Sequence, residues 1–163
     1  MHFTCRPVDM SFFDTAPMRF KNVVELEAPA AKVFAIFDDE RSWPEWFGAI
    51  RKVVWTSDRP HGVGSTRTVS LSTATIYEHF FQWELDRRLT FYLTGASMPL
   101  AQAFAEDYLL EELAPGKTRF TYRVAIEPRL PVALGGRLSR MYFGSMFKSA
   151  CETLQSYVRK VGT

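Results

Sequence analysis

A long segment near the end of the chain, residues 131–160, most constrains the possible folds, because it alone keeps a helical period over many turns. Its apolar side chains recur at three- and four-residue steps and form one stripe, made of Phe143, Met146, Phe147, Ala150, Leu154, Tyr157 and Val158. An unbroken helix of this length would span roughly 45 Å. Gly135 and Gly136 each weaken a helix by about 1 kcal/mol, so the first turns are expected to be separate or kinked. Such a helix needs a broad apolar partner.

The rest of the chain supplies this partner as a series of predicted strands. An alternating strand at 19–27 precedes a helix that begins at Pro29 and a very short helix opened by Ser42-Trp43-Pro44-Glu45, a capping-box pattern. Six further strands are predicted at 50–57, 66–71, 75–83, 88–94, 103–113 and 118–126. Strands joined by short links pair as antiparallel neighbours. The sequence thus predicts an α+β fold in the order β-α-α-β-β-β-β-β-β-α, a curved sheet packed on the long C-terminal helix.

Length and composition predict a single domain. The chain has 163 residues, of which 47% are hydrophobic, enough for a sizeable core. Residues 1–18 are interpreted as an N-terminal arm that Met10, Phe12 and Phe13 anchor to the body, and residues 19–163 as one domain. The oligomeric state expected is monomer or homodimer.

Charge and targeting patterns restrict which binding partners and which cellular location are expected. The formal net charge is only +2 and no basic run occurs, so no nucleic-acid partner is expected. No apolar run approaches the roughly 20 residues of a membrane span, so no integral membrane association is expected. The first residues lack the basic-then-apolar order of a signal peptide. A soluble, cytoplasmic protein is the expectation.

Several motifs, in this order and spacing, resemble the START-like superfamily, also called SRPBCC or Bet v 1-like, in its polyketide cyclase/dehydrase branch. They are VELEAPAAKVFAIFDD, SWPEWFGAI, HGVGSTRTVSL, ATIYEHFFQWELDRRLTFYLTG, PGKTRFTYRVAIEP and the long helix, which together cover about residues 19–160. The resemblance implies a helix-grip fold, a seven-stranded antiparallel sheet wrapped around the C-terminal helix with a deep cavity between them. It implies little about the reaction, since the superfamily includes carriers, receptors, cyclases and chaperone co-factors.

A buried ion pair is predicted on two neighbouring strands. If Ser72-Thr73 forms a two-residue hairpin, Arg67 lies opposite Glu78 on a face that is otherwise apolar and that Phe80 continues. A longer loop would shift this register, because Ser-Thr is not a preferred hairpin turn. Arg67 or Glu78 would then meet a polar group on an apolar ligand. The alternatives are a fixed structural pair or a pair on the outer face of the sheet.

A second polar candidate is Glu106, which shares its strand face with Tyr108, whereas Asp107 lies on the other face. Both faces carry apolar residues, so which acid points inward is left open. An inward Glu106 near Tyr122 would accept a hydrogen bond or, with a raised pKa, act as a general acid. The alternative is a carboxylate that faces water.

The remaining candidates are apolar. Phe91 is expected on the inner face of the sheet, and Met141 and Tyr142 of the long helix are expected to touch a ligand. Trp43, Trp46 and Phe47 are expected at the cavity mouth. Ordinary core packing is the alternative for all of them. No metal site and no cofactor are predicted, because the three histidines are scattered and Gly62-Val63-Gly64 lacks the third glycine of a dinucleotide loop.

Three functions compete. The favoured one is binding of a small hydrophobic molecule, such as a lipid, polyketide, isoprenoid or aromatic compound, in an internal cavity. The second is a cyclase, aromatase or dehydratase that uses arginine, glutamate and tyrosine side chains of the cavity for acid–base work. The third is a protein-interaction module, which would show a filled interior and an exposed apolar patch. No nucleophile motif favours the enzyme.

Overall fold

The computed structural model describes residues 1–162. Its elements, in chain order, are β1 (Phe3–Thr4), α1 (Phe12–Thr15), β2 (Met18–Leu26), α2 (Ala30–Asp38), α3 (Trp43–Trp46), β3 (Ile50–Trp55), β4 (Thr66–Leu71), β5 (Thr75–Glu84), β6 (Arg88–Ala96), β7 (Ala101–Ala114), β8 (Lys117–Pro128), α4 (Leu130–Leu134) and α5 (Gly136–Val161). The predicted order of the main elements is confirmed.

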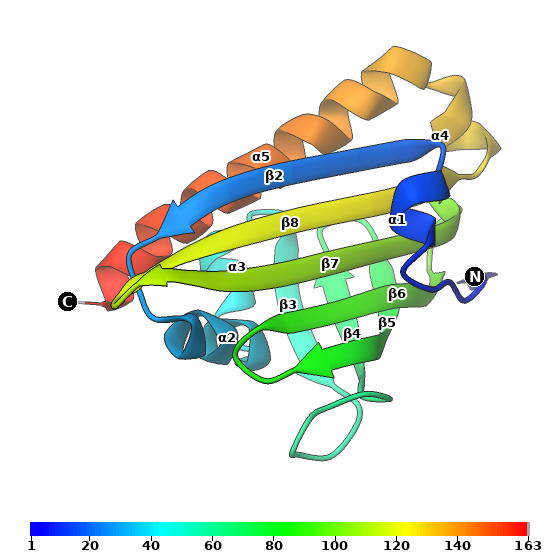
Figure 1. Ribbon diagram of the computed structural model, residues 1–163. Coiled ribbons are helices and arrows are strands. Elements are labelled where there is room, and N and C mark those ends of the chain that lie inside the picture. Colours follow the sequence, from blue (N-terminus) through cyan, green and yellow to red (C-terminus); the bar gives the residue numbers. More distant parts are fainter. Residues whose placement is uncertain (163) are drawn as a thin grey trace.

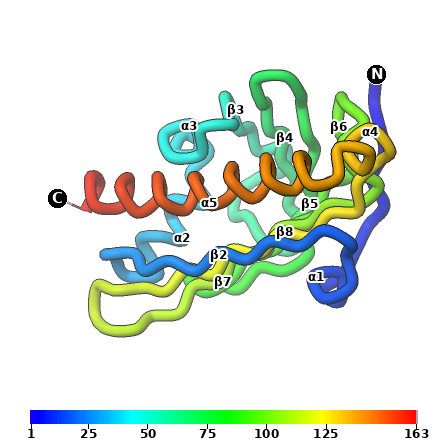
Figure 2. Tube along the Cα trace, turned by 90° about the horizontal axis from the view of Figure 1, so that it is seen from above, coloured from blue at the N-terminus to red at the C-terminus, as the bar shows by residue number. Residues whose placement is uncertain are grey.

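Seven antiparallel strands form one curled sheet in the order β2-β8-β7-β6-β5-β4-β3 (Figure 1). The first strand therefore lies beside the last, and α2 and α3 carry the chain across to the opposite edge at β3. Irregular pairing at Tyr77/Glu78, Phe80/Gln82 and Ala101/Ala103 interrupts the ladders, and such bulges increase strand twist. The sheet curls around α5, which lies along its concave side (Figure 2). This is the helix-grip fold.

The long helix is divided, as its two glycines predict. α4 ends at Leu134 and α5 begins at Gly136, whose φ of +48° is a conformation that favours glycine. The buried residues of α5 are Phe147, Ala150, Cys151, Leu154 and Val158, all in its C-terminal part. The helix is thus buried in the core from Phe147 onward, whereas Phe143 and Met146 before it pack against the core only partly buried.

The short helix α3 begins differently from the predicted capping box. The Ser42 hydroxyl makes no cap bond to α3; it donates instead to the Ile36 and Asp39 carbonyl oxygens at the end of α2, at 2.5 and 3.0 Å. The capping-box prediction is therefore wrong. Ser42 joins the two helices, and the Trp43 indole N–H supports the same link by donating to the Phe37 carbonyl.

The N-terminal arm packs on the convex face of the sheet. β1 pairs with the end of β6, and α1 buries Phe12 and Phe13 against Ala103, Ala105 and Ala125. The small alanine side chains on this face allow α1 to approach the strands closely. Met10 packs partly buried against the same cluster, so all three residues expected to hold the arm contact the folded body.

Candidate functional site

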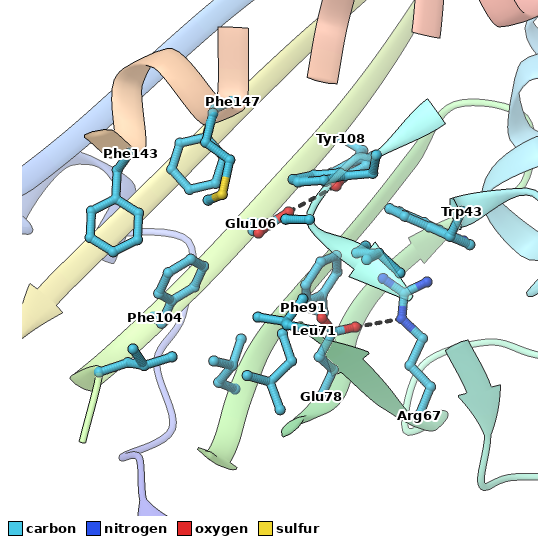
Figure 3. A pocket seen from close by; sticks show the side chains of 17 residues that line it. Trp43, Arg67, Leu71, Glu78, Phe91, Phe104, Glu106, Tyr108, Phe143 and Phe147 are labelled. Carbon is cyan, nitrogen blue, oxygen red and sulfur yellow. Dashed lines mark hydrogen bonds and ion pairs between the residues drawn. The ribbon is translucent and has the colours of Figure 1, made fainter. Parts of the chain in front are cut away.

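A cavity of about 70 Å³ lies between the concave face of the sheet, α3 and the middle of α5 (Figure 3). Its wall is apolar except for four side chains, Arg67, Glu78, Glu106 and Tyr108. The apolar lining residues are Trp43, Phe47, Ala49, Ile50, Leu71, Ile76, Phe91, Leu93, Leu100, Phe104, Phe143, Met146 and Phe147. Such a wall suits an apolar guest with a few fixed polar contacts.

The register of β4 and β5 places the ion pair in this wall. Arg67 pairs directly with Glu78, and Leu71 bonds to Ala74 across the two-residue turn, as predicted. The Arg67 Nε donates to Glu78 Oε2, and both side chains are almost fully buried. The outer-face alternative is excluded, because both residues face the interior.

The Arg67 guanidinium lies among aromatic rings. Its Cζ is 4.2 Å from the Trp43 ring centroid, 5.0 Å from that of Phe91 and 5.1 Å from that of Phe80. Rings at this distance attract a cation and partly replace its lost water. The Nη1 nitrogen is nevertheless buried without a hydrogen-bond partner among residues 1–162. A buried donor of this kind costs free energy until an acceptor reaches it.

Glu106 is the second polar point of the cavity. Its Oε2 accepts hydrogen bonds from the hydroxyls of Tyr108 and Tyr122, both at 2.8 Å. Figure 3 shows the first of these bonds. Burial, and next the negative charge of Glu78, raise the pKa of Glu106 to about 7, although the two tyrosine hydrogen bonds oppose the shift. Near neutral pH this carboxyl can therefore both donate and accept a proton.

Burial also raises the pKa values of the other titratable groups in and behind the cavity wall. It raises the pKa of Glu78, and the adjacent Arg67 offsets only part of this effect. Burial, and then the charge of Glu106, raise the pKa values of Tyr108 and Tyr122 well above the usual range. Both tyrosines thus stay neutral and act as hydrogen-bond donors to Glu106.

Asp107 lies on the opposite face of β7, which settles the question left open by the sequence. It is fully buried and accepts hydrogen bonds from Arg88, Arg123 and Thr90 at 2.7–3.0 Å. Burial works to raise its pKa, but these hydrogen bonds outweigh that effect and hold the pKa below its usual value. Asp107 ties three strands together, whereas Glu106 faces the cavity.

The predicted aromatic candidates divide into three groups. Trp43, Phe47 and Phe91 line the cavity. Trp46, Phe80 and Tyr122 are buried behind the lining. Met141 and Tyr142 are 65% and 66% exposed and do not line it, so the prediction that they face the cavity is wrong.

The inward side of α5 instead presents Phe143, Met146 and Phe147 to the cavity. These residues belong to the apolar stripe recognised in the sequence, and Met141 and Tyr142 lie off that stripe. The helical period of the sequence thus indicated which residues of α5 line the cavity. Phe104 and Leu100, from β7 and the loop before it, also line the cavity and had no comparable signal.

Comparison with known proteins agrees with this architecture. A family model described as "Polyketide cyclase / dehydrase and lipid transport" matches residues 17–159. An uncharacterized protein of Mycobacterium tuberculosis is 37% identical over 124 residues, which cover 76% of this chain and 74% of that protein. An uncharacterized protein of Mycobacterium bovis matches with the same figures.

Solved structures show the same fold at low sequence identity. A START superfamily protein from Mycobacterium smegmatis has a TM-score of 0.75 and 16% identity, covering 88% of this chain and 98% of that one. The Zhui aromatase/cyclase from Streptomyces sp. R1128 has a TM-score of 0.67 and 13% identity, covering 86% and 90%. The resemblance drawn from the sequence motifs is confirmed, and the chain belongs to the polyketide cyclase/dehydrase and lipid transport family.

Proposed function

We propose that this protein binds a small, mostly apolar molecule that carries at least one oxygen acceptor, in the cavity between the sheet and α5. The observation that supports this most directly is the buried Arg67 Nη1, a donor without a partner in an apolar wall. A carbonyl, carboxylate or phenolate oxygen would satisfy it. A plain hydrocarbon would leave it unpaired, so the site favours an oxygenated guest.

The cavity has to widen for a ligand of ordinary size. Its volume of about 70 Å³ lies well below the roughly 300–1,000 Å³ of ligand sites. Phe143 and Met146 form the helix side of the wall and are only partly buried, and no residue before Phe147 in α5 is buried. Outward movement of these turns would enlarge the cavity without opening the main core.

A pair of fluorescent probes tests the polar contact. 1-Anilinonaphthalene-8-sulfonate carries an anionic oxygen group, and N-phenyl-1-naphthylamine is similar in shape but lacks the sulfonate. The variant combining Arg67→Met with Glu78→Gln removes both charges, so no carboxylate is left unpaired. We expect it to bind the sulfonate probe at least about tenfold more weakly, a loss of 1.4 kcal/mol or more, and the neutral probe nearly unchanged.

Equal losses for the two probes would show that Arg67 supports the wall and does not contact the guest. The single variant Thr68→Val, one position along β4 and on the opposite face, serves as the control and should change neither affinity. Native mass spectrometry of protein purified from its own host would then identify a co-purified molecule.

A second candidate function is acid–base catalysis on such a molecule, and Glu106 is the observation that favours it. A carboxyl with a pKa of about 7 and two tyrosine donors can move a proton near neutral pH. The similarity to an aromatase/cyclase fits this reading. An enzyme would lose turnover in Glu106→Gln while retaining the bound compound, whereas a carrier would show no turnover in either form.

A further inference from the structure

The N-terminal half of α5, together with α4, presents an apolar surface to solvent. Leu130 and Leu134 of α4 are 74% and 83% exposed, and Leu138 of α5 is 75% exposed. With the exposed Met141 and Tyr142 they make five large apolar side chains within residues 130–142 of two consecutive helices, here called the α4–α5 face. Single exposed apolar residues are common, but five of them close together on two adjoining helices favour an interaction site.

This face lies on the side of the helix away from the sheet. Around the helix axis, Leu138 and Met141 lie between about a third and half a turn from Phe143 and Phe147, which line the cavity. The first turns of α5 are therefore apolar on two opposite sides. A surface helix normally carries one apolar stripe, which faces the core, so the second apolar side lacks a partner in the described chain.

The charges beside this face all have one sign. Residues 129–151 contain Arg129, Arg137, Arg140 and Lys148 and no acidic residue. Because the whole chain has a formal net charge of only +2, the remainder of the protein is net negative. The positive charge is thus concentrated on the element that carries the exposed apolar residues.

None of these four cations forms an ion pair within residues 1–162. The side chains of Arg129 and Arg140 donate only to backbone carbonyl oxygens, and those of Arg137 and Lys148 make no hydrogen bond in the described chain. The opposite end of the same helix differs, since Arg159 pairs with Glu27 of the strand-to-helix turn. The N-terminal end therefore keeps its charge free for an external anion.

We propose that the α4–α5 face docks on an anionic lipid bilayer. Exposed Leu, Met and Tyr side chains enter the interfacial region, and the arginines and Lys148 contact phosphate headgroups. This is surface docking; no described helix is long and apolar enough to span a bilayer. Phe143 and Met146 of the same turns line the cavity, so docking brings this wall to the lipid surface.

The test uses the full chain and vesicles separated by flotation. We expect binding to vesicles of phosphatidylcholine mixed with phosphatidylglycerol, weaker binding to phosphatidylcholine alone, and release at high salt. The double variant Leu138→Ser with Met141→Ser should weaken binding at least about tenfold, since each side chain buries apolar area in the interface. Arg137→Gln should cost about fivefold on anionic vesicles.

Matched controls are Leu85→Ser, which is 75% exposed in the β5–β6 turn, and Arg41→Gln, an exposed cation between α2 and α3. Neither should change flotation. All substituted positions are exposed, so unchanged thermal melting should show that the variants fold.

Failure to float with anionic vesicles at low salt, or equal flotation of the double variant and the original chain, would overturn the proposal. Sedimentation velocity could also show that the original chain is a dimer and the double variant a monomer, with no vesicle binding by either. That result would assign the face to a second copy of the chain and would overturn the docking proposal. Docking does not depend on what the cavity holds, so the probe titrations and the flotation assay can fail separately.

Discussion

Among single residues, two carboxyl groups of the cavity, those of Glu78 and Glu106, are both buried, which raises the pKa of each. Their hydrogen-bond partners differ. Glu78 is held by the Arg67 cation, whereas Glu106 is held by two neutral hydroxyls. A cation stabilises a carboxylate more than a neutral donor does. Burial nevertheless raises the pKa of both groups, and that of Glu106 reaches about 7.

This difference predicts a pH-dependent stability. The folded chain holds the Glu106 proton up to about pH 7, and the unfolded chain releases it near pH 4.5. Between these values the folded state binds more protons, so the free energy of unfolding falls as the pH rises and levels off above about 7. The raised pKa of Glu78 acts in the same direction.

Glu106→Gln removes the titrating group but keeps an oxygen for the tyrosine hydroxyls. In this variant the unfolding free energy should fall less steeply with pH, by up to about 1.4 kcal/mol per pH unit. Urea unfolding at several pH values measures this slope. Exposed Glu112→Gln is the control and should retain the decline. Identical pH dependence in the original chain and Glu106→Gln would contradict the assignment.

The ion pair predicts a contrast between single and double substitution. Arg67→Ala leaves the Glu78 carboxyl buried without a cation, which typically costs about 3–5 kcal/mol of unfolding free energy. The variant Arg67→Met with Glu78→Gln should cost much less, because no charge remains in the wall. Denaturant unfolding of both variants measures the difference, and equal costs would show that packing of the arginine stem is what matters.

At the scale of elements, α5 consists of an anchored half and a loosely packed half. Leu154 is fully buried, whereas Leu138 is 75% exposed in the same helix. The loosely packed half is connected to β8 only through the short α4, and Gly135 and Gly136 lie at the junction of the two helices. The turns that line the cavity are thus also the turns with the least core support.

A pair of leucine substitutions checks this division. Leu154→Ala should lower the free energy of unfolding by about 2–5 kcal/mol, since it leaves a cavity in the core. Leu138→Ala should change it by less than about 0.5 kcal/mol. In hydrogen exchange, amides of residues 137–145 should exchange faster than those of 150–158. Similar protection in both halves would rule out movement of the first half as the way to widen the cavity.

At the scale of the whole molecule, both faces of the sheet are used. The concave face holds the main core and the cavity, and the convex face receives the arm through Phe12 and Phe13. The arm also pairs with β6, and Arg6 forms an ion pair with Glu127 of β8. The N-terminal residues thus brace the strands that carry Glu78 and Glu106 from behind.

Phe12→Ala should therefore destabilise the whole fold by about 3 kcal/mol, because a buried aromatic ring is removed from the convex face. Val63→Ala, 70% exposed in the β3–β4 loop, is the control and should have little effect. Thermal unfolding followed by circular dichroism measures both. A Phe12 variant that melts like the original chain would show that the arm only rests on the sheet.

Much of this arrangement could be predicted from the sequence, because hydrophobic period and short links specify which elements form and which strands are neighbours. The Arg67–Glu78 register followed from the two-residue turn. The direction of Met141 and Tyr142 was missed, since their hydrophobicity suggested burial although their helical positions lie off the inward stripe. Ser42 was misread because a capping-box pattern does not show where the hydroxyl finds its acceptor.

The order of elements, the antiparallel sheet and the long helix follow from the sequence alone, and the pairing of Arg67 with Glu78 follows only on the condition that Ser72-Thr73 forms a two-residue turn. Only the tertiary structure decided that Glu106 faces the cavity and Asp107 faces its arginines, and that the cavity is small. Alternation along a strand separates two faces but does not say which becomes concave. That choice, and the volume left inside, depend on how distant side chains meet when the sheet closes on α5.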